Sequence, residues 1–238
     1  GTLEHPTAFE KYIYRRSINI MRFNHIFKLT NENETHREYK CDNVNINIDF
    51  ISGSALRVAV FNDNAEMLPT FTVNPNNNLS SLGRSRLSVD GFDCVAPVVE
   101  KFENKEKFVL DCGVTVDLDL NNFILSYSKE SKLLFADRAP LAYNFEGEFG
   151  NGSYHYITRE DDEHIFGLGD KSGLINKAGQ VYRVETADSM GFDAEKTDPL
   201  YKHVPFYICE NSVGAYGIYY DTTDTSFVDL GREINNYY

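Results

Sequence analysis

Residues 166–173, FGLGDKSG, combine three glycines with a lysine, a composition that could bind a phosphate. Gly167, Gly169 and Gly173 would let backbone N–H groups approach an anion closely. However, a Walker loop ends in Gly-Lys-Ser/Thr before a helix, and a dinucleotide fingerprint reads G-x-G-x-x-G at a helix start. Here the third glycine is misplaced, and the strand-like QVYRVET follows instead of a helix. The spacing argues against a phosphate site, and we expect no cofactor.

The histidines, cysteines and acidic residues show no spacing that is typical of a metal or a nucleophile. The six histidines never form H-x-x-x-H, and no C-x-x-C pair occurs. We expect Cys41, Cys94, Cys112 and Cys209 to be buried, reduced thiols. The acidic run REDDEH at 159–164 lacks the spaced ligands and glycine of a calcium loop, which favours a solvated turn. Residue types and spacing therefore predict neither a catalytic residue nor a metal site in this chain.

Composition restricts the partners that the chain could bind. Its 238 residues include 23 basic and 36 acidic side chains, which gives a net charge of −13. Such a charge repels nucleic acid and anionic membranes, whereas neutral sugars carry no penalty. The sequence shows neither an 18-residue apolar run nor a basic segment followed by an apolar one. We therefore expect no nucleic-acid partner, no membrane partner and a cytoplasmic location.

The elements that must position any site are strands, because the dominant apolar period is two. Residues 43–51, NVNINIDFI, alternate apolar and polar side chains, which predicts a half-buried strand with one solvated face. The SGS turn then leads into ALRVAVF and completes a hairpin. Residues 114–120 alternate in the same way, and turns at NN and KESK predict a three-stranded meander with the two strands that follow.

Five further short segments, each bounded by turn residues, also read as strands. They are 153–160, 180–186, 204–210, 215–221 and 225–231. Residues 62–107 are less regular, and no helical period persists over a dozen residues. Many short strands without intervening helices predict an all-β, antiparallel sandwich.

Four segments of the second half resemble one known family in order and spacing. FGLGDKSG, NKAGQVYRVETAD, GFDAEKTDPLYKHVPFYI and GAYGIYYD resemble the end of the N-terminal β-sandwich of glycoside hydrolase family 31, the α-glucosidase and α-xylosidase family. The resemblance is specific over residues 164–231, whereas upstream only the strand order is similar. It implies a galactose-mutarotase-like supersandwich. It also implies that residues 1–238 are the N-terminal domain of a larger glycosidase.

The same resemblance implies where the chemistry lies. Both catalytic carboxylates would come from a (β/α)8 barrel outside this chain and would act with retention, which needs carboxyl groups about 5 Å apart. This chain would be inactive alone, with that barrel and an α-linked oligosaccharide or glucoside as its partners. The segment ETADSMGFD matches a loop whose aspartate binds sugar hydroxyls, and the matching residue here is Asp193. Phe192 beside it could present an apolar face to the sugar or to the barrel.

Several alternatives stay open. Many relatives carry Trp-Asn where this chain has Glu185-Thr186, so a preference for glucosides over xylosides does not follow from the resemblance. The chain could instead be a free-standing, lectin-like carbohydrate-binding sandwich, although it contains no tryptophan to stack on a sugar. An aldose mutarotase would need a His/Glu acid–base pair, and no spacing identifies one. A homo-oligomer is also compatible with the sequence.

Overall fold

The computed structural model describes residues 25–75, 82–143 and 153–233, and within these ranges every regular element is a strand. All strand pairs are antiparallel. The strands are β1 (Lys28–Glu32), β2 (His36–Cys41), β3 (Val44–Ser52), β4 (Ala55–Asn62), β5 (Val98–Lys101), β6 (Lys105–Val109), β7 (Val114–Asp119), β8 (Ile124–Lys129), β9 (Lys132–Ala136), β10 (His164–Gly169), β11 (Val181–Val184), β12 (His203–Glu210), β13 (Ala215–Tyr219) and β14 (Ser226–Asp229). The all-β, antiparallel prediction is therefore confirmed. The described part of the chain contains no helix that could cross a bilayer.

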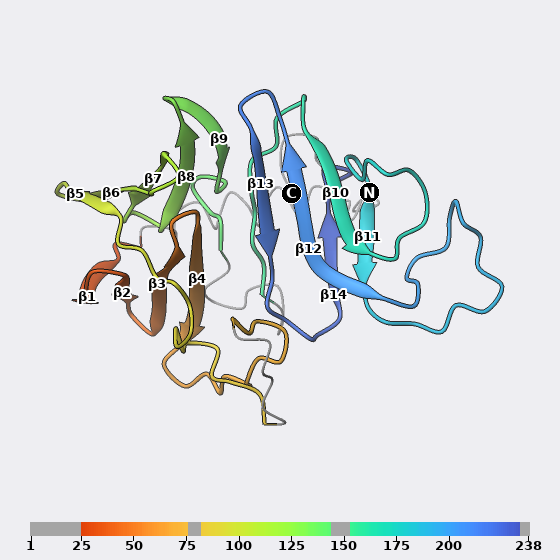
Figure 1. The fold of residues 1–238 in the computed structure, drawn as a ribbon, viewed down its shortest axis with the longest axis horizontal. Helices are drawn as coiled ribbons and strands as arrows, with labels where there is room; N and C mark the ends of the chain where they lie inside the picture. The colour runs from red at the N-terminus through yellow and green to blue at the C-terminus, as the bar shows by residue number, and fades with distance from the viewer. Residues whose placement is uncertain (1–24, 76–81, 144–152, 234–238) are drawn as a thin grey trace, which may run out of the picture.

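Two sheets enclose a first hydrophobic core in the N-terminal half. One sheet has the order β1-β2-β3-β4 and the other the order β5-β6-β7-β8-β9 (Figure 1). The alternating side chains of β3 and β7 supply much of this core, since Ile46, Ile48, Val116 and Leu118 are all fully buried. Aromatic rings also pack within it, and the ring centres of Phe50 and Phe108 lie 5.1 Å apart.

A second core lies in the C-terminal half. It joins the three-stranded sheet β10-β12-β13 to the pair β11-β14, which lie together in Figure 1. Side chains of β12 alternate strictly, so that Tyr207 and Cys209 are buried in this core while their neighbours face outward. A bulge in β10 between Gly167 and Gly169 breaks the pairing with β12, at residues whose missing side chains permit it.

Stacked aromatic rings connect the two halves. Tyr127 of β8 stacks on Phe135 of β9 at 4.0 Å, and Phe135 stacks on Tyr216 of β13 at 4.1 Å. This stack runs from the first pair of sheets into the second, which joins the two cores in one supersandwich.

The alternation correctly predicted most strands. The hairpin of β3 and β4 and the meander of β7, β8 and β9 are confirmed. In the C-terminal half, the predicted strands at 180–186, 204–210, 215–221 and 225–231 correspond to β11, β12, β13 and β14. Each of these segments carries apolar side chains on one face and is bounded by turn residues, which is the pattern that predicted it.

Two strand predictions were wrong. Residues 62–107 were expected to be irregular, but they contain β5 and most of β6, which pair in a hairpin. Residues 153–160 were expected to form a strand, but they form only isolated bridges, through His155 to Tyr143 and through Ile157 to Asp137. This segment alternates like a strand, but its partners lie in the chain that follows β9, which forms no continuous strand for it to pair with.

The face of β3 that was expected to be solvated is largely buried. Asn47 and Asp49 are less than a tenth exposed. Asp49 is covered because Arg57 binds its carboxylate at 2.7 Å and also donates to the carbonyl groups of residues 86–88. A loop thus closes over the polar face, and its arginine compensates the buried charge.

The prediction for the cysteines was only partly right. All four are free thiols. Cys209 is buried in the second core, but Cys41 and Cys94 are partly exposed and Cys112 is exposed. Cys112 follows β6 in the turn toward β7, and turns of this kind lie at the protein surface.

Candidate functional site

The candidate site is the loop of residues 185–202, which connects β11 to β12 and extends away from the sheets at the right of Figure 1. Backbone hydrogen bonds close its base, where Ala187 N–H donates to the Leu200 carbonyl at 3.1 Å. Leu200 is buried beneath the loop. The hydroxyl of Thr186 lies 2.9 Å from Nδ1 of His203, where β12 begins. The two ends of the loop are therefore held together.

A nearly buried ion pair anchors the loop to the glycine-rich segment that precedes β11. Nζ of Lys171, whose side chain is 1% exposed, lies 2.8 Å from Oδ1 of Asp198. Oδ2 of Asp198 accepts a hydrogen bond from the Arg183 backbone N–H at 2.6 Å. Asp198 thus ties the loop to the backbone of β11 and also neutralises a buried lysine.

Two lysines beside Tyr182 shape the electrostatics under the loop. Nζ of Lys177 lies 5.4 Å from the centre of the Tyr182 ring and donates to the Ser172 carbonyl at 3.1 Å. Burial and the nearby charge of Lys171 lower the pKa of Lys177. Burial, together with the Asp198 charge, raises the pKa of the Tyr182 hydroxyl. These residues contact one another and Asp198 near the base of the loop.

Asp193 lies at the exposed tip in a tight turn. Its backbone N–H donates to Oγ1 of Thr197 at 2.8 Å, and its carbonyl accepts from the Thr197 N–H at 3.0 Å. Its Oδ1 atom accepts from the Glu195 N–H at 2.8 Å. Gly173 N–H donates to the carbonyl of Ala194 at 2.9 Å, which ties the turn to the glycine-rich segment. The aspartate is therefore fixed in place, with carboxylate surface still open to solvent.

Phe192 lies beside Asp193 and packs on Tyr201. The two rings meet edge to face, with centres 6.3 Å apart. The Tyr201 hydroxyl donates to the Ser189 carbonyl at 3.2 Å, and the Ser189 hydroxyl donates to the carbonyl of Pro199 at 2.7 Å. Half of the Phe192 side chain remains exposed. The tip therefore presents a carboxylate and an aromatic edge next to each other.

This arrangement can bind but cannot by itself catalyse. A carboxylate can accept charge-assisted hydrogen bonds from vicinal hydroxyls, and an aromatic ring can cover apolar C–H groups. Catalysis of glycoside hydrolysis would need a second carboxyl group at a defined distance. A shallow cavity of about 340 Å³ lies elsewhere, against β7 and β8 and lined in part by Asp117, Asn122 and Pro140, and no loop residue lines it.

The structure also unites a His–Asp pair that sequence reasoning missed. Nε2 of His155 lies 3.0 Å from Oδ1 of Asp137, and Nδ1 lies 2.9 Å from the hydroxyl of Tyr220. These partners are 18 and 65 residues away, so no spacing rule could have found them. Burial raises the pKa of both Tyr220 and Tyr143, and the Tyr143 ring stacks on the imidazole at 4.6 Å.

The His155–Asp137 pair is in contact with Tyr143 and Tyr220. This position suits a role in supporting the fold and not the acid–base role that a mutarotase would need. The other oxygen of Asp137 accepts from the Leu125 backbone N–H at 3.0 Å. The cluster therefore connects β8 to the segment between β9 and β10. None of its members lines the cavity described above.

One group of three side chains in the described ranges could hold a metal ion. It consists of His25, Cys41 and Asp42, at the opposite end of the described chain from the loop. Within the described ranges, no such group lies in the 185–202 loop.

Comparison with known proteins agrees with this fold. The family model "Glycosyl hydrolase 31 N-terminal galactose mutarotase-like domain" matches residues 45–229. The match extends well upstream of the segments that carried the sequence resemblance. Alpha-glucosidase 2 of Bacillus thermoamyloliquefaciens is 25% identical over 112 residues, which are 47% of this chain and 14% of that relative.

Solved structures show the same fold at low sequence identity. A family 31 dextranase of Flavobacterium johnsoniae, complexed with glucose, superposes with a TM-score of 0.68 at 22% identity, covering 91% of this chain and 24% of that chain. The cycloalternan-forming enzyme of Listeria monocytogenes gives 0.67 at 14% identity, covering 90% of this chain and 19% of that one. This chain thus spans a quarter or less of each of these relatives. The family match nevertheless covers most of its residues, and the chain belongs to the N-terminal galactose mutarotase-like domains of glycosyl hydrolase family 31.

Proposed function

We propose that this chain is the N-terminal domain of a retaining α-glycosidase, most directly an α-glucosidase. It is inactive alone, packs on a catalytic barrel and contributes the 185–202 loop to that barrel's active site. Support comes from the family match and from relatives named as an alpha-glucosidase and a dextranase. The observation that carries the proposal is the position of this loop, which leads directly into an exposed apolar sheet face.

That face consists of outward side chains on β12 and β13. Val204, Phe206 and Ile208 alternate with buried neighbours, and Tyr219 lies opposite Phe206 on the paired strand. These four side chains are 37–45% exposed. Contiguous apolar side chains on one sheet face are typical of a surface that another domain covers. We infer that this apolar face is the docking surface for the barrel.

The loop would then reach the barrel's mouth from the edge of the docking surface. Active sites of such barrels lie at the carboxyl ends of the strands, where an added domain can complete a pocket. There Asp193 would accept hydrogen bonds from two sugar hydroxyls and fix the orientation of the ring. Phe192 would pack on the sugar or on the barrel wall.

The bond-breaking groups would both belong to the barrel. A nucleophile and an acid/base about 5 Å apart would retain the anomeric configuration through a covalent intermediate. Asp193 takes no part in proton transfer in this scheme. It acts through orientation alone, so its loss would weaken substrate use without altering the stereochemical outcome.

The test compares the full-length protein with the isolated chain. Full-length protein is expected to hydrolyse maltose or isomaltose, with NMR showing the α-anomer as the first product. Isolated residues 1–238, titrated with the same sugars in a calorimeter, are expected to show neither binding nor hydrolysis. Millimolar binding by the isolated chain would favour the lectin-like alternative, and turnover by it would refute the assignment of catalysis to the barrel.

A further inference from the structure

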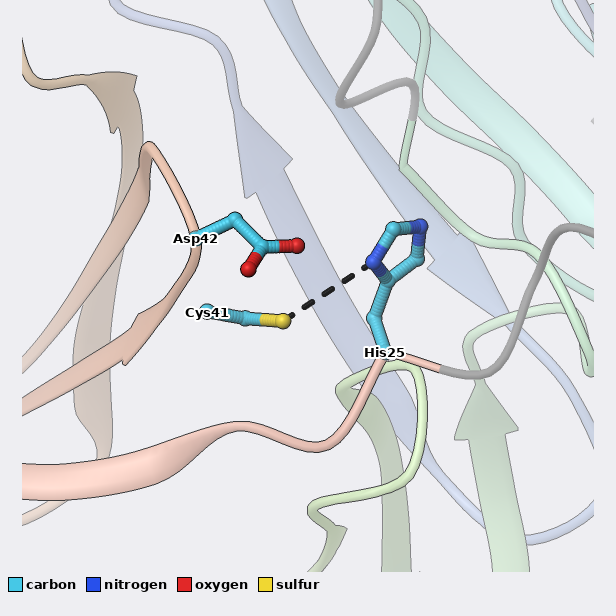
Figure 2. A group of neighbouring side chains, drawn as sticks. All are labelled: His25, Cys41 and Asp42. Carbon is cyan, nitrogen blue, oxygen red and sulfur yellow. Dashed lines mark hydrogen bonds between the residues drawn. The ribbon is translucent and has the colours of Figure 1, made fainter.

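Three potential metal ligands meet where the chain enters the first sheet. His25 lies just before β1, Cys41 is the last residue of β2, and Asp42 lies in the turn toward β3. Figure 2 shows the thiol and the carboxylate side by side, both facing the imidazole. An imidazole nitrogen, the sulfur and a carboxylate oxygen all lie within 4.8 Å of one another.

The distances suit a single small ion. Sγ of Cys41 lies 3.8 Å from Nδ1 of His25. A tetrahedral zinc ion with Zn–S of about 2.3 Å and Zn–N of about 2.0 Å holds these two atoms roughly 3.5 Å apart. A shift of a few tenths of an ångström would therefore bring both atoms to bonding distance. The same separation also permits a weak S–H···N hydrogen bond, and the experiment below distinguishes the two.

The backbone holds each ligand in place independently of any ion. His25 N–H donates to Oδ1 of Asn122 at 3.0 Å, and its carbonyl accepts from the Asn122 N–H at 2.7 Å. Cys41 pairs with Val44 at the end of the β2–β3 hairpin. Neighbouring side chains on a strand point to opposite faces, but Asp42 has φ of 50°, which takes it out of the strand. Its carboxylate is thereby brought to the side of Cys41.

We propose that His25, Cys41 and Asp42 bind one zinc-class divalent cation. Thiolate and imidazole ligands favour zinc over calcium or magnesium, which prefer oxygen ligands alone. Binding requires the thiolate, so the thiol releases its proton to solvent as the metal–sulfur bond forms. With three protein ligands, a tetrahedral ion takes a water molecule as its fourth. The protein's net charge of −13 favours the accumulation of cations.

A bound ion would clip the segment before β1 to the β2–β3 turn. It would thereby stabilise the edge of the first sheet, because a ligand that binds only the folded state raises stability. This role is separate from the proposed glycosidase activity. The cluster lies beside β1 and β2 of the first sheet, whereas the 185–202 loop connects β11 to β12 in the C-terminal half.

Titration of the full-length protein with Co²⁺ provides the test, because cobalt bound to a thiolate gives a charge-transfer absorption in the near ultraviolet. Wild-type protein is expected to bind one equivalent with this absorption, and added Zn²⁺ is expected to displace it. Cys41→Ser is expected to abolish the absorption. Asp42→Asn is expected to weaken binding by about tenfold or more. Asparagine tolerates positive φ, so this variant keeps the turn.

Cys112→Ser is the matched control, because Cys112 is an exposed thiol outside the cluster. It is expected to leave the absorption and the affinity unchanged. The melting temperature gives a second readout, since Zn²⁺ is expected to raise it in wild type and not in Asp42→Asn. Absence of the absorption in wild type would overturn the proposal and leave a Cys–His hydrogen bond, and so would its retention in Cys41→Ser.

Discussion

The Oδ1 atom of Asp193 accepts a hydrogen bond from the Glu195 backbone N–H at 2.8 Å. The same carboxylate therefore has a structural task in its own loop, in addition to the proposed contact with substrate. Oδ1 stabilises the turn, and within the described ranges Oδ2 accepts no hydrogen bond from another residue. The two tasks can be separated by substitution, because an amide can perform the first but not the second equally well.

Asp193→Asn is expected to keep the turn and to lower kcat/KM of the full-length protein on α-glucosides. The amide oxygen still accepts from Glu195 N–H, but the negative charge is lost, and charge-assisted hydrogen bonds contribute about 1.5–3 kcal/mol. We therefore expect a loss of roughly tenfold or more in kcat/KM. Glu195→Gln is the control, since Glu195 contacts Asp193 through its backbone. Wild-type kinetics in Asp193→Asn would refute the substrate contact.

Gly169→Ala is expected to destabilise the protein more than Gly179→Ala. Both glycines have positive φ, of 80° and 74°. A Cβ at Gly169 would lie 2.8 Å from the Lys202 carbonyl oxygen, whereas one at Gly179 would meet nothing within 4 Å. The positive φ alone is expected to lower the free energy of unfolding of Gly179→Ala by about 1–2 kcal/mol. In Gly169→Ala, displacement of β12 is expected to add roughly 1–3 kcal/mol to this loss. Urea unfolding measures both, and equal losses would contradict the close packing of β10 on β12.

His36 is expected to make stability depend on pH. Burial opposes its protonation, but hydrogen bonds to Glu38 at 3.0 Å and to Asp49 at 2.6 Å outweigh this and raise the pKa of His36. Arg57, which binds the other oxygen of Asp49, is the positive charge that faces this group. Because the pKa is higher in the folded state, the stabilisation is complete below the unfolded pKa of about 6.5 and is lost as pH rises through the folded pKa.

The measurement compares wild type with His36→Gln by urea unfolding across this pH range. The difference in free energy of unfolding is expected to be larger at acidic pH and to shrink as pH rises. His164→Gln serves as a control at an exposed histidine. A difference that stays constant with pH would show that His36 does not contribute through its charge.

The alternation of apolar and polar residues predicted most strands correctly, but it did not predict which segments pair or what covers each face of a strand. The alternation of Ile46 and Ile48 identified β3, but the burial of Asp49 depends on Arg57 and on a loop some 30 residues away. Residues 153–160 alternate as a strand does, yet a strand needs a neighbour to pair with, and alternation carries no information on neighbours. The β5–β6 hairpin was missed because its strands are short and rich in charge.

For the candidate site, too, the sequence indicated individual residues but not the contacts between residues that are distant in the chain. The resemblance points to Asp193 and Phe192, whose contact with substrate stays a prediction, and the structure places both at the tip of one exposed loop. The anchor of the loop could not be predicted, because Lys171 and Asp198 lie 27 residues apart and meet only through the fold. The same applies to His25 and Cys41, whose 16-residue separation matches no metal motif.

Covalent footprinting of the full-length protein tests the central claim most directly. If the apolar face of β12 and β13 is the docking surface for the barrel, Phe206 and Ile208 should be protected from a diffusible carbene reagent. Val98 and Phe102, exposed apolar residues of the β5–β6 hairpin, should be labelled readily and serve as internal controls. Labelling of Phe206 and Ile208 at the rate of Val98 and Phe102 would contradict the account, because the face would then lie open to solvent in the intact protein.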